Sequence, residues 1–224
     1  MGKLDSLDKR IGYTFSNKEL QIQSLTHRSA SAKNNERLEF LGDSILGFVI
    51  SKELFQRFPD AQEGQLSRLR ASLVKGDTLA KIARELELGN YLQLGSGELK
   101  SGGYRRSSIL ADAFEALIGA VYLDSDIKQA EHFVLQFYNE KLAACDPSKA
   151  QKDPKTQLQE ILQAEASALP VYTVLKTGGE AHNQTFEVEC FIQERNIKQT
   201  GTGTSRRKAE QAAASKVLEM ISNE

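Results

Sequence analysis

The sequence is poor in cysteine, has no long apolar run and carries no excess of charge of either sign. Its two cysteines, Cys145 and Cys190, lie far apart and outside any C-x-x-C or metal-ligand spacing. This usage is typical of reduced thiols and predicts a cytoplasmic protein. No apolar segment is long enough to span a bilayer, and the charged start MGKLDSLDKR is unlike a signal peptide, so we expect no membrane partner.

The net charge of −1 argues against a protein that coats nucleic acid by bulk electrostatics. Contacts with nucleic acid would therefore have to come from local clusters of basic residues. The sequence also lacks the G-x-x-x-x-G-K-[ST] phosphate loop, so the glycine-containing segment 95–103 predicts an ordinary loop. No Ser/His/Asp or Cys/His arrangement supports covalent catalysis, and His27 and His132 are interpreted as structural or surface residues.

Two acidic residues stand out, because Asp112 and Glu115 are the only charged residues between Ile109 and Leu123. The surrounding residues predict a helix that is buried on nearly every side, with both acids on one face. Carboxylates are rarely buried without a partner. Either a bound cation or arginines from elsewhere in the chain could provide that partner.

A second acidic group lies in the segment NERLEFLGDS at residues 35–44. Glu36, Glu39 and Asp43 would fall within ~60° of one another on a helix. The opposite side is expected to pack against the core and carries Leu38, Leu41, Ile45 and Phe48. Taken alone, the acids also fit a solvated face. Together with Asp112 and Glu115 they favour an all-oxygen site that suits Mg²⁺, with Mn²⁺ able to substitute.

The chain divides into two regions of different texture. Apolar residues recur at helical spacing in 20–25, 38–55, 66–74, 79–86, 109–123 and 127–142, which predicts an all-α domain over 1–145. Residues 146–153 lack large apolar side chains and are interpreted as a linker. The rest, 154–224, predicts a small α+β domain in the order α-β-β-β-α, with helices at 156–165 and 205–221 and strands at 171–175, 185–192 and 196–200.

A basic cluster occupies the predicted start of the last helix. Arg206, Arg207 and Lys208 follow Ser205, a suitable capping residue. A helix N-terminus carries partial positive charge, so three cations are unfavourable there unless an anion binds. A phosphodiester backbone is the anion that we expect, and the preceding loop Gly201-Thr-Gly-Thr would leave room for its approach. A solvated charge cluster is the alternative.

These segments resemble those of ribonuclease III, an endonuclease that cuts double-stranded RNA. The resemblance rests on HRS at 27–29, NERLEFLGDS at 35–44, GELKSGG at 97–103 and ADAFEALIGA at 111–120. Further along, GEAHNQTFEV at 179–188 and GTGTSRRKAEQAAA at 201–214 resemble a double-stranded RNA-binding domain. The resemblance covers essentially the whole chain.

The resemblance implies an activity and a set of site residues. Glu39, Asp112 and Glu115 would ligate Mg²⁺, and Asp43 and Glu115 would be essential to the chemistry. Two further acids, Glu36 and Glu63, would support the site. RNA would contact Thr156, Gln157, Glu160, His182, Arg206, Arg207 and Lys208.

The family's enzymes are homodimers that leave 5′-phosphate and 3′-hydroxyl ends with two-nucleotide 3′ overhangs. Their substrates include precursor rRNA, some structured mRNAs and tRNA precursors. The apolar Phe40 beside the acidic face fits a subunit contact. Two other functions remain open from the sequence, namely a catalytically idle RNA-binding or ribosome-assembly protein and a metal-dependent hydrolase of small phosphate esters.

Overall fold

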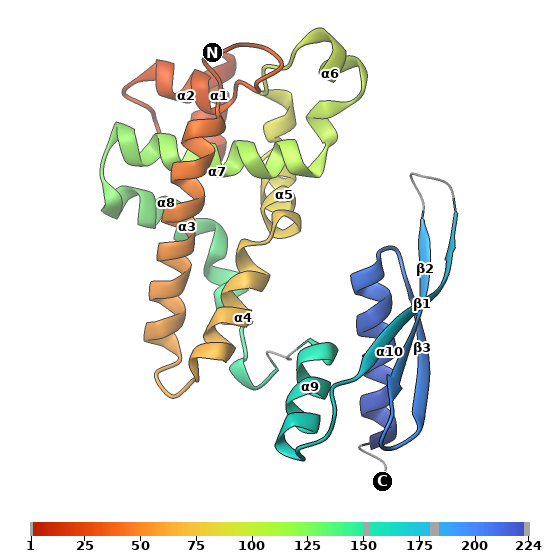
Figure 1. Cartoon of the computed structure of the whole chain (residues 1–224). Helices are drawn as coiled ribbons and strands as arrows, with labels where there is room; N and C mark the ends of the chain where they lie inside the picture. Colours follow the sequence, from red (N-terminus) through yellow and green to blue (C-terminus); the bar gives the residue numbers. More distant parts are fainter. Residues whose placement is uncertain (1, 150–152, 180–183, 222–224) are drawn as a thin grey trace. The chain divides into compact units, whose positions relative to one another are not determined.

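The computed structural model describes residues 2–149, 153–179 and 184–221. The chain separates into two compact units, Met1–Ala150 and Gln151–Glu224, and each has its own hydrophobic core (Figure 1). Within the described residues, no helix combines the length and apolarity that crossing a membrane requires. Cys145 and Cys190 are both free thiols.

The described part of the first unit is helical. Its α-helices are α1 (Lys3–Ile11), α2 (Lys18–Ser24), α3 (Glu36–Arg57), α4 (Glu63–Val74), α5 (Gly76–Glu85), α6 (Ser96–Lys100), α7 (Ser107–Asp124) and α8 (Ile127–Ala143). Short 3₁₀ turns add η1 (Leu88–Asn90), η2 (Gly103–Arg105) and η3 (Pro147–Lys149). Side-chain caps start two of the helices, since Asn17 accepts a hydrogen bond at α2 and Asp126 at α8.

The centre of the first unit is α7, which is apolar on nearly all sides and is contacted by α2, α3, α5 and α8. Figure 1 shows α7 crossing α3 near the start of α3. Glycines make this crossing close. A Cβ on Gly42 would lie 1.8 Å from the carbonyl oxygen of Glu115, and one on Gly119 would lie 2.3 Å from that of Leu38. The crossing therefore requires residues without side chains.

Two local predictions for this unit are wrong. The segment 95–103 is not an ordinary loop, because it contains α6. Phe48 does not pack against the core, and its side chain is 55% exposed. The buried arc of α3 runs through Gly42, Leu46 and Val49 toward α7, which turns the side of the helix that carries Phe48 toward solvent.

The second unit contains α9 (Pro154–Ala164), β1 (Val171–Gly178), β2 (Thr185–Ile192), β3 (Ile197–Gly203) and α10 (Arg206–Ile221). The strands form an antiparallel sheet in the order β1-β2-β3, in which Val188 pairs with Val174 and Gly201. Alternate residues of β2 are buried beneath the helices, as the period-two pattern predicts. The α-β-β-β-α fold class is confirmed.

The residues Gly201-Thr-Gly-Thr have a different role from the predicted one. Gly201 and Gly203 belong to β3 rather than to a loop. A Cβ at Gly201 would lie 2.1 Å from the backbone nitrogen of Ala213, and one at Gly203 would lie 2.6 Å from that of Ala209. The two glycines therefore let α10 approach the sheet and are not needed as room for an anion.

Candidate functional site: an acidic cluster and a basic helix start

Three carboxylates from two helices meet at the α3–α7 crossing. Glu39 of α3 and Asp112 and Glu115 of α7 each offer an oxygen atom, and these three atoms lie within 4.8 Å of one another. The three side chains are half-buried, and Asp43, one turn further along α3, is exposed beside them. The crossing thus brings together four of the acids that the sequence singled out.

The electrostatics of this acidic cluster favour a positive partner. Burial, followed by the negative charges of Asp43, Glu39 and Asp112, raises the pKa of Glu115 to about 8. Burial and the neighbouring acids also raise the pKa of Glu39. Burial raises the pKa of Asp112, although the charges of His27 and Arg28 oppose this shift. Within the described residues, neither Asp112 nor Glu115 forms an ion pair with an arginine, and the nearby charge of Arg28 does not cancel the raised pKa of Asp112.

The donor atoms determine which ion the cluster could hold. Glu39, Asp112 and Glu115 supply only carboxylate oxygens, without a thiolate or an imidazole. Hard divalent cations such as Mg²⁺ and Mn²⁺ prefer oxygen ligands, whereas zinc prefers nitrogen and sulfur. A cation placed among the three carboxylates would offset the repulsion that raises their pKa values. The residues therefore fit a hard divalent ion.

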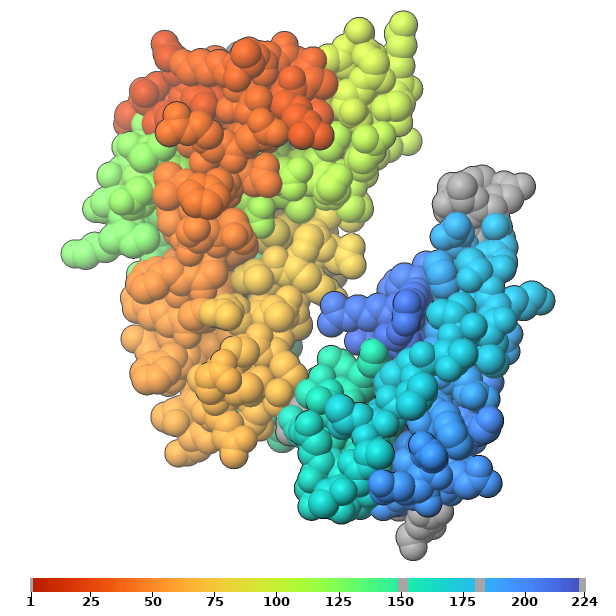
Figure 2. Space-filling view, in the orientation of Figure 1, coloured from red at the N-terminus to blue at the C-terminus, as the bar shows by residue number. Residues whose placement is uncertain are grey.

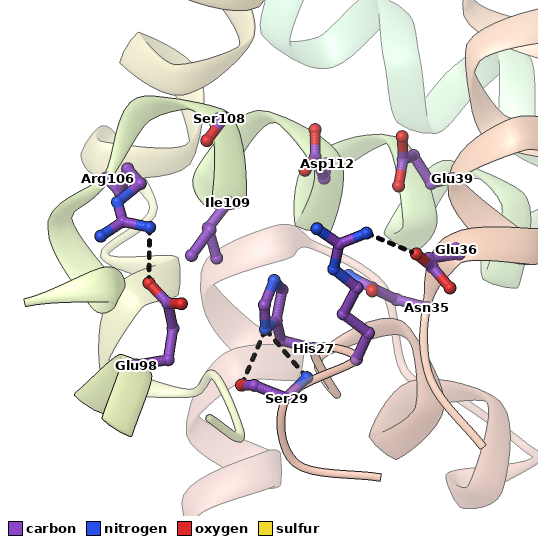
Figure 3. Close-up of a pocket in the computed structure, with 11 residues that line it drawn as sticks. His27, Ser29, Asn35, Glu36, Glu39, Glu98, Arg106, Ser108, Ile109 and Asp112 are labelled. Carbon is purple, nitrogen blue, oxygen red and sulfur yellow. Dashed lines mark hydrogen bonds and ion pairs between the residues drawn. The ribbon is translucent and has the colours of Figure 1, made fainter. Parts of the chain in front are cut away.

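A cavity of about 430 Å³ adjoins the cluster, and some of the residues that line it were not predicted from the sequence (Figure 3). It is lined by His27, Arg28, Ser29, Asn35, Glu36, Glu39, Glu98, Arg106, Ser108, Ile109 and Asp112. His27, interpreted above as structural or surface, forms part of its wall. Arg28, Glu98 and Arg106 were not proposed as site residues, although Arg28 and Glu98 belong to the motifs HRS and GELKSGG.

The two supporting acids lie in different places. Glu36 lines the cavity, with Arg28 3.4 Å from its carboxylate. Glu63 is exposed in the first turn of α4 and accepts a hydrogen bond from Ser67 at 2.6 Å. The α3 helix rises ~27 Å between Glu39 and its last residue, and α4 begins only after that end. Within one chain, the structure does not bring Glu63 to the cluster.

In the second unit, the predicted contact residues of α9 are exposed. Thr156, Gln157 and Glu160 lie near the start of the helix, within one turn of one another. The backbone nitrogen and hydroxyl of Thr156 both donate to the carboxylate of Asp153, which caps the helix. His182 lies outside the described residues.

The basic residues begin α10 as predicted, and Ser205 accepts a hydrogen bond from the backbone nitrogen of Lys208 at 3.3 Å. Arg206, Arg207 and Lys208 are all exposed. Arg206 also donates to Glu210 at 2.9 Å, and Lys155 of α9 donates to the other oxygen of the same carboxylate at 2.6 Å.

Glu210 is therefore a structural residue that the sequence reasoning missed. Its side chain is only 11% exposed. Burial by itself would raise the pKa of Glu210, but the hydrogen bonds from Lys155 and Arg206 outweigh it and lower the pKa. The shared carboxylate links the start of α9 to the start of α10, the two places where RNA contacts are predicted.

Comparison with known proteins shows the same division of the chain. Residues 17–142 match the family described as Ribonuclease-III-like, and residues 154–221 match the double-stranded RNA binding motif. Proteins named Ribonuclease 3 from Vibrio parahaemolyticus and Vibrio cholerae are each 58% identical to this chain over 220 residues, covering 98% of both sequences.

Solved structures also match the first unit. The nuclease domain of ribonuclease III from Campylobacter jejuni is 40% identical, with a TM-score of 0.62, and the match covers 65% of this chain and 100% of that domain. Another structure of that domain, concerned with flexibility in a region involved in dimer formation, is 41% identical with a TM-score of 0.61 over 62% of this chain and 97% of that one. With the acidic cluster on α3 and α7 and the RNA-binding motif after it, the chain belongs to the ribonuclease III family.

Proposed function

We propose that the protein is a Mg²⁺-dependent endoribonuclease that hydrolyses phosphodiester bonds in double-stranded RNA. The observation that carries this proposal is the convergence of Glu39, Asp112 and Glu115 within 4.8 Å, in a chain that also has a double-stranded RNA binding motif. A duplex held by the second unit would present its backbone to a site that can hold a hard cation. Small phosphate esters would not require such a unit.

The residues at the cluster have separate roles in this proposal. Glu39, Asp112 and Glu115 hold Mg²⁺, for which Mn²⁺ can substitute. The bound ion would lower the pKa of a water molecule and offset negative charge on the phosphate during attack. Asp43, whose charge acts on Glu115, would orient that water molecule from the exposed side of the cluster. The half-buried setting of Glu39, Asp112 and Glu115 limits solvent screening of their charges.

The products follow from hydrolysis that breaks the bond to the 3′ oxygen. Of the two fragments of the cut strand, one then ends in a 3′-hydroxyl and the other begins with a 5′-phosphate. Two sites in a dimer, each cutting one strand, would leave two-nucleotide 3′ overhangs. Precursor rRNA, structured mRNAs and tRNA precursors in the cytoplasm are the substrates that we infer from the family.

A homodimer is supported by the surface of α3. This helix lies along the visible face of the first unit in Figure 2. Phe40, Phe48 and Phe55 of α3 are 78%, 55% and 72% exposed, and Leu123 of α7 is 52% exposed. Next to Phe40 is a cavity of about 660 Å³ with a partly apolar lining. Exposed apolar patches of this kind mark protein interfaces, and a second copy of α3 would cover this one.

We further propose that residues 1–145 form the catalytic domain, 146–153 the linker and 154–224 the RNA-binding domain. In the last of these, Thr156, Gln157 and Glu160 would face the minor groove of the duplex. Arg206, Arg207 and Lys208 would bind phosphates next to that minor groove. His182, between β1 and β2 in the sequence, would make a further contact with the RNA. Such contacts recognise the A-form shape more than the sequence.

Incubation with long duplex RNA, with and without Mg²⁺, tests the proposed function. We expect cleavage only with the ion, into short duplexes whose 5′ ends are phosphorylated and whose 3′ ends are free hydroxyls. Single-stranded RNA of the same sequence is the control and should remain intact. Duplex binding without cleavage at any Mg²⁺ concentration would instead identify an idle RNA-binding protein and refute the enzyme.

A further inference from the structure

The cavity beside the acidic cluster carries a cationic side chain near each end. Nη1 of Arg106 lies 2.7 Å from Oε1 of Glu98, and Nη1 of Arg28 lies 3.4 Å from Oε1 of Glu36. Figure 3 shows Arg106 with Glu98 at one end of the cavity and Glu36 at the other, with Asp112 between them on α7. Positive charge is therefore placed on both sides of the carboxylates that would hold the ion.

Neither arginine is firmly committed to its carboxylate partner. The side chains of Arg28 and Arg106 are 71% and 50% exposed, and ion pairs in such positions are weak because water screens them. The Oε1 atom of Glu98 is buried, and within the described residues it lacks a hydrogen bond of good geometry despite the short distance to Arg106. Both guanidinium groups can therefore exchange a carboxylate for a phosphate, which they can bind through two hydrogen bonds.

The wall of the cavity is held in place before any ligand binds. The backbone nitrogen of Ser29 donates to Nδ1 of His27 at 3.2 Å, and the backbone nitrogen of Gly95 donates to the hydroxyl of Ser29 at 2.9 Å. Because Nδ1 accepts a hydrogen bond, the neutral ring carries its proton on Nε2. In Figure 3 the ring extends from Ser29 toward Asp112, so the free N–H group faces the cavity.

We propose that this cavity binds the RNA phosphate next to the one that is cleaved, with Arg28 and Arg106 as its main ligands and Nε2–H of His27 as a further donor. This inference rests on the proposed function, since the ligand is the backbone of the same duplex. Glu36 and Glu98 hold the two arginines near the cavity until RNA replaces them. The bound phosphate fixes the register of the strand, so that the neighbouring phosphodiester lies at the acidic cluster.

Steady-state cleavage of long duplex RNA at several salt concentrations tests this assignment. For Arg28→Ala and Arg106→Ala we expect kcat/KM to fall on the order of tenfold each, mainly through KM, because each removes a charged hydrogen-bond donor. The slope of log kcat/KM against log salt should become less steep by about one for each arginine removed. Arg106→Lys keeps the charge and should recover part of the loss.

Glu98→Gln tests whether Arg106 acts by binding phosphate or only through its ion pair with Glu98. The variant disrupts that ion pair but leaves Arg106 in place, so we expect a KM equal to or lower than that of the wild-type protein. Arg84→Ala is the matched control, because Arg84 donates to Ser107 at the start of α7 but does not line the cavity. It should leave the salt slope unchanged.

Two results would overturn the phosphate subsite while leaving the enzyme intact. One is an equal loss of kcat/KM in Glu98→Gln and Arg106→Ala, and the other is an unchanged salt slope in the double variant of Arg28 and Arg106. Wild-type protein that cuts no duplex RNA would instead refute the proposed function itself.

Discussion

Gly42 of α3 and Gly119 of α7 face each other where the two helices cross. A Cβ on Gly42 would lie 3.1 Å from the backbone nitrogen of Gly119. Glu39 and Asp43 flank Gly42 along α3, and Glu115 lies one turn before Gly119 on α7. The distance between the carboxylates therefore depends on two helix backbones that touch without side chains between them.

Gly42→Ala is expected to destabilise the protein by about 1–3 kcal/mol, because the added methyl group would overlap the backbone of α7. It should also weaken Mg²⁺ binding, since the two helices must separate. Gly47 is a matched control in the same helix, because its Cβ would meet no atom within 4 Å. Gly47→Ala should stabilise by roughly 0.5–1 kcal/mol through helix propensity. Chemical denaturation measures both changes, and equal effects would contradict the close crossing.

Glu115→Gln is expected to reduce kcat for duplex cleavage by ~100-fold or more, because it removes a charged ligand from the proposed ion site. Duplex binding in a gel shift should remain, since the proposed RNA contacts are made by other residues, mainly those of the second unit. Glu53→Gln is the control, an acid of α3 that pairs with Arg57 away from the cluster. Normal cleavage by Glu115→Gln, or loss of duplex binding, would remove Glu115 from the site.

The metal-free protein is expected to lose stability as pH rises from about 4.5 to about 8. Over this range Glu115, with its pKa raised from 4.5 to about 8, keeps a proton in the folded state that the unfolded chain has released. Stability is greatest at low pH, where both states hold the proton, and declines while the unfolded chain releases the proton that the folded state retains. Thermal midpoints measured in chelator should therefore fall across this window, and less so in Glu115→Gln. Saturating Mg²⁺ should flatten the decline, and a midpoint that rises with pH in chelator would contradict the raised pKa.

Arg207→Ala combined with Lys208→Ala is expected to weaken duplex binding about equally across RNA sequences. Each lost phosphate contact should reduce the slope of log affinity against log salt by about one. Arg206 is left intact because it also pairs with the buried Glu210, so its removal would disturb folding. Lys198→Ala, on the sheet beside Phe191, is the control. An unchanged salt slope in the double variant would show that these residues do not bind phosphate.

Phe40→Ser is expected to shift the protein from dimer toward monomer, because it removes a 78% exposed aromatic side chain from the proposed interface. Sedimentation at several protein concentrations measures the change. Leu169→Ser, an exposed apolar residue of the second unit, serves as the control and should leave the dimer intact. A monomeric wild-type protein would refute the proposed dimer.

Local sequence patterns were sufficient for much of the fold. An apolar stretch with two isolated acids predicted α7 and the unusual setting of Asp112 and Glu115. The alternation in Thr185–Ile192 predicted β2 with the bounds that the structure has. These predictions succeeded because burial imposes its period directly on neighbouring residues. The start of α10 was predictable in the same way, from a serine cap followed by a helical pattern.

The remaining features depend on contacts between distant segments. The sequence around Gly201 and Gly203 fits a loop as well as a strand. Only the close approach of α10 explains why these positions are glycines. Phe48 has the right spacing for the core, but its burial depends on which side of α3 meets α7. Arg28 and Arg106 are ordinary surface arginines until the fold places both at one cavity. The helical and strand periodicity of the sequence does not predict contacts between distant segments.

The carboxylate shared by Lys155 and Arg206 has a consequence for how the second unit meets RNA. Separating the first turns of α9 and α10 would leave the buried Glu210 without a partner, which is strongly unfavourable. The shared carboxylate therefore restrains the spacing of both turns before a ligand binds, which reduces the ordering of the protein that association requires. The grooves of an A-form helix also lie at regular distances, whereas a flexible single strand presents no fixed spacing. Discrimination between the two forms of RNA can thus arise from geometry, without any contact to a base.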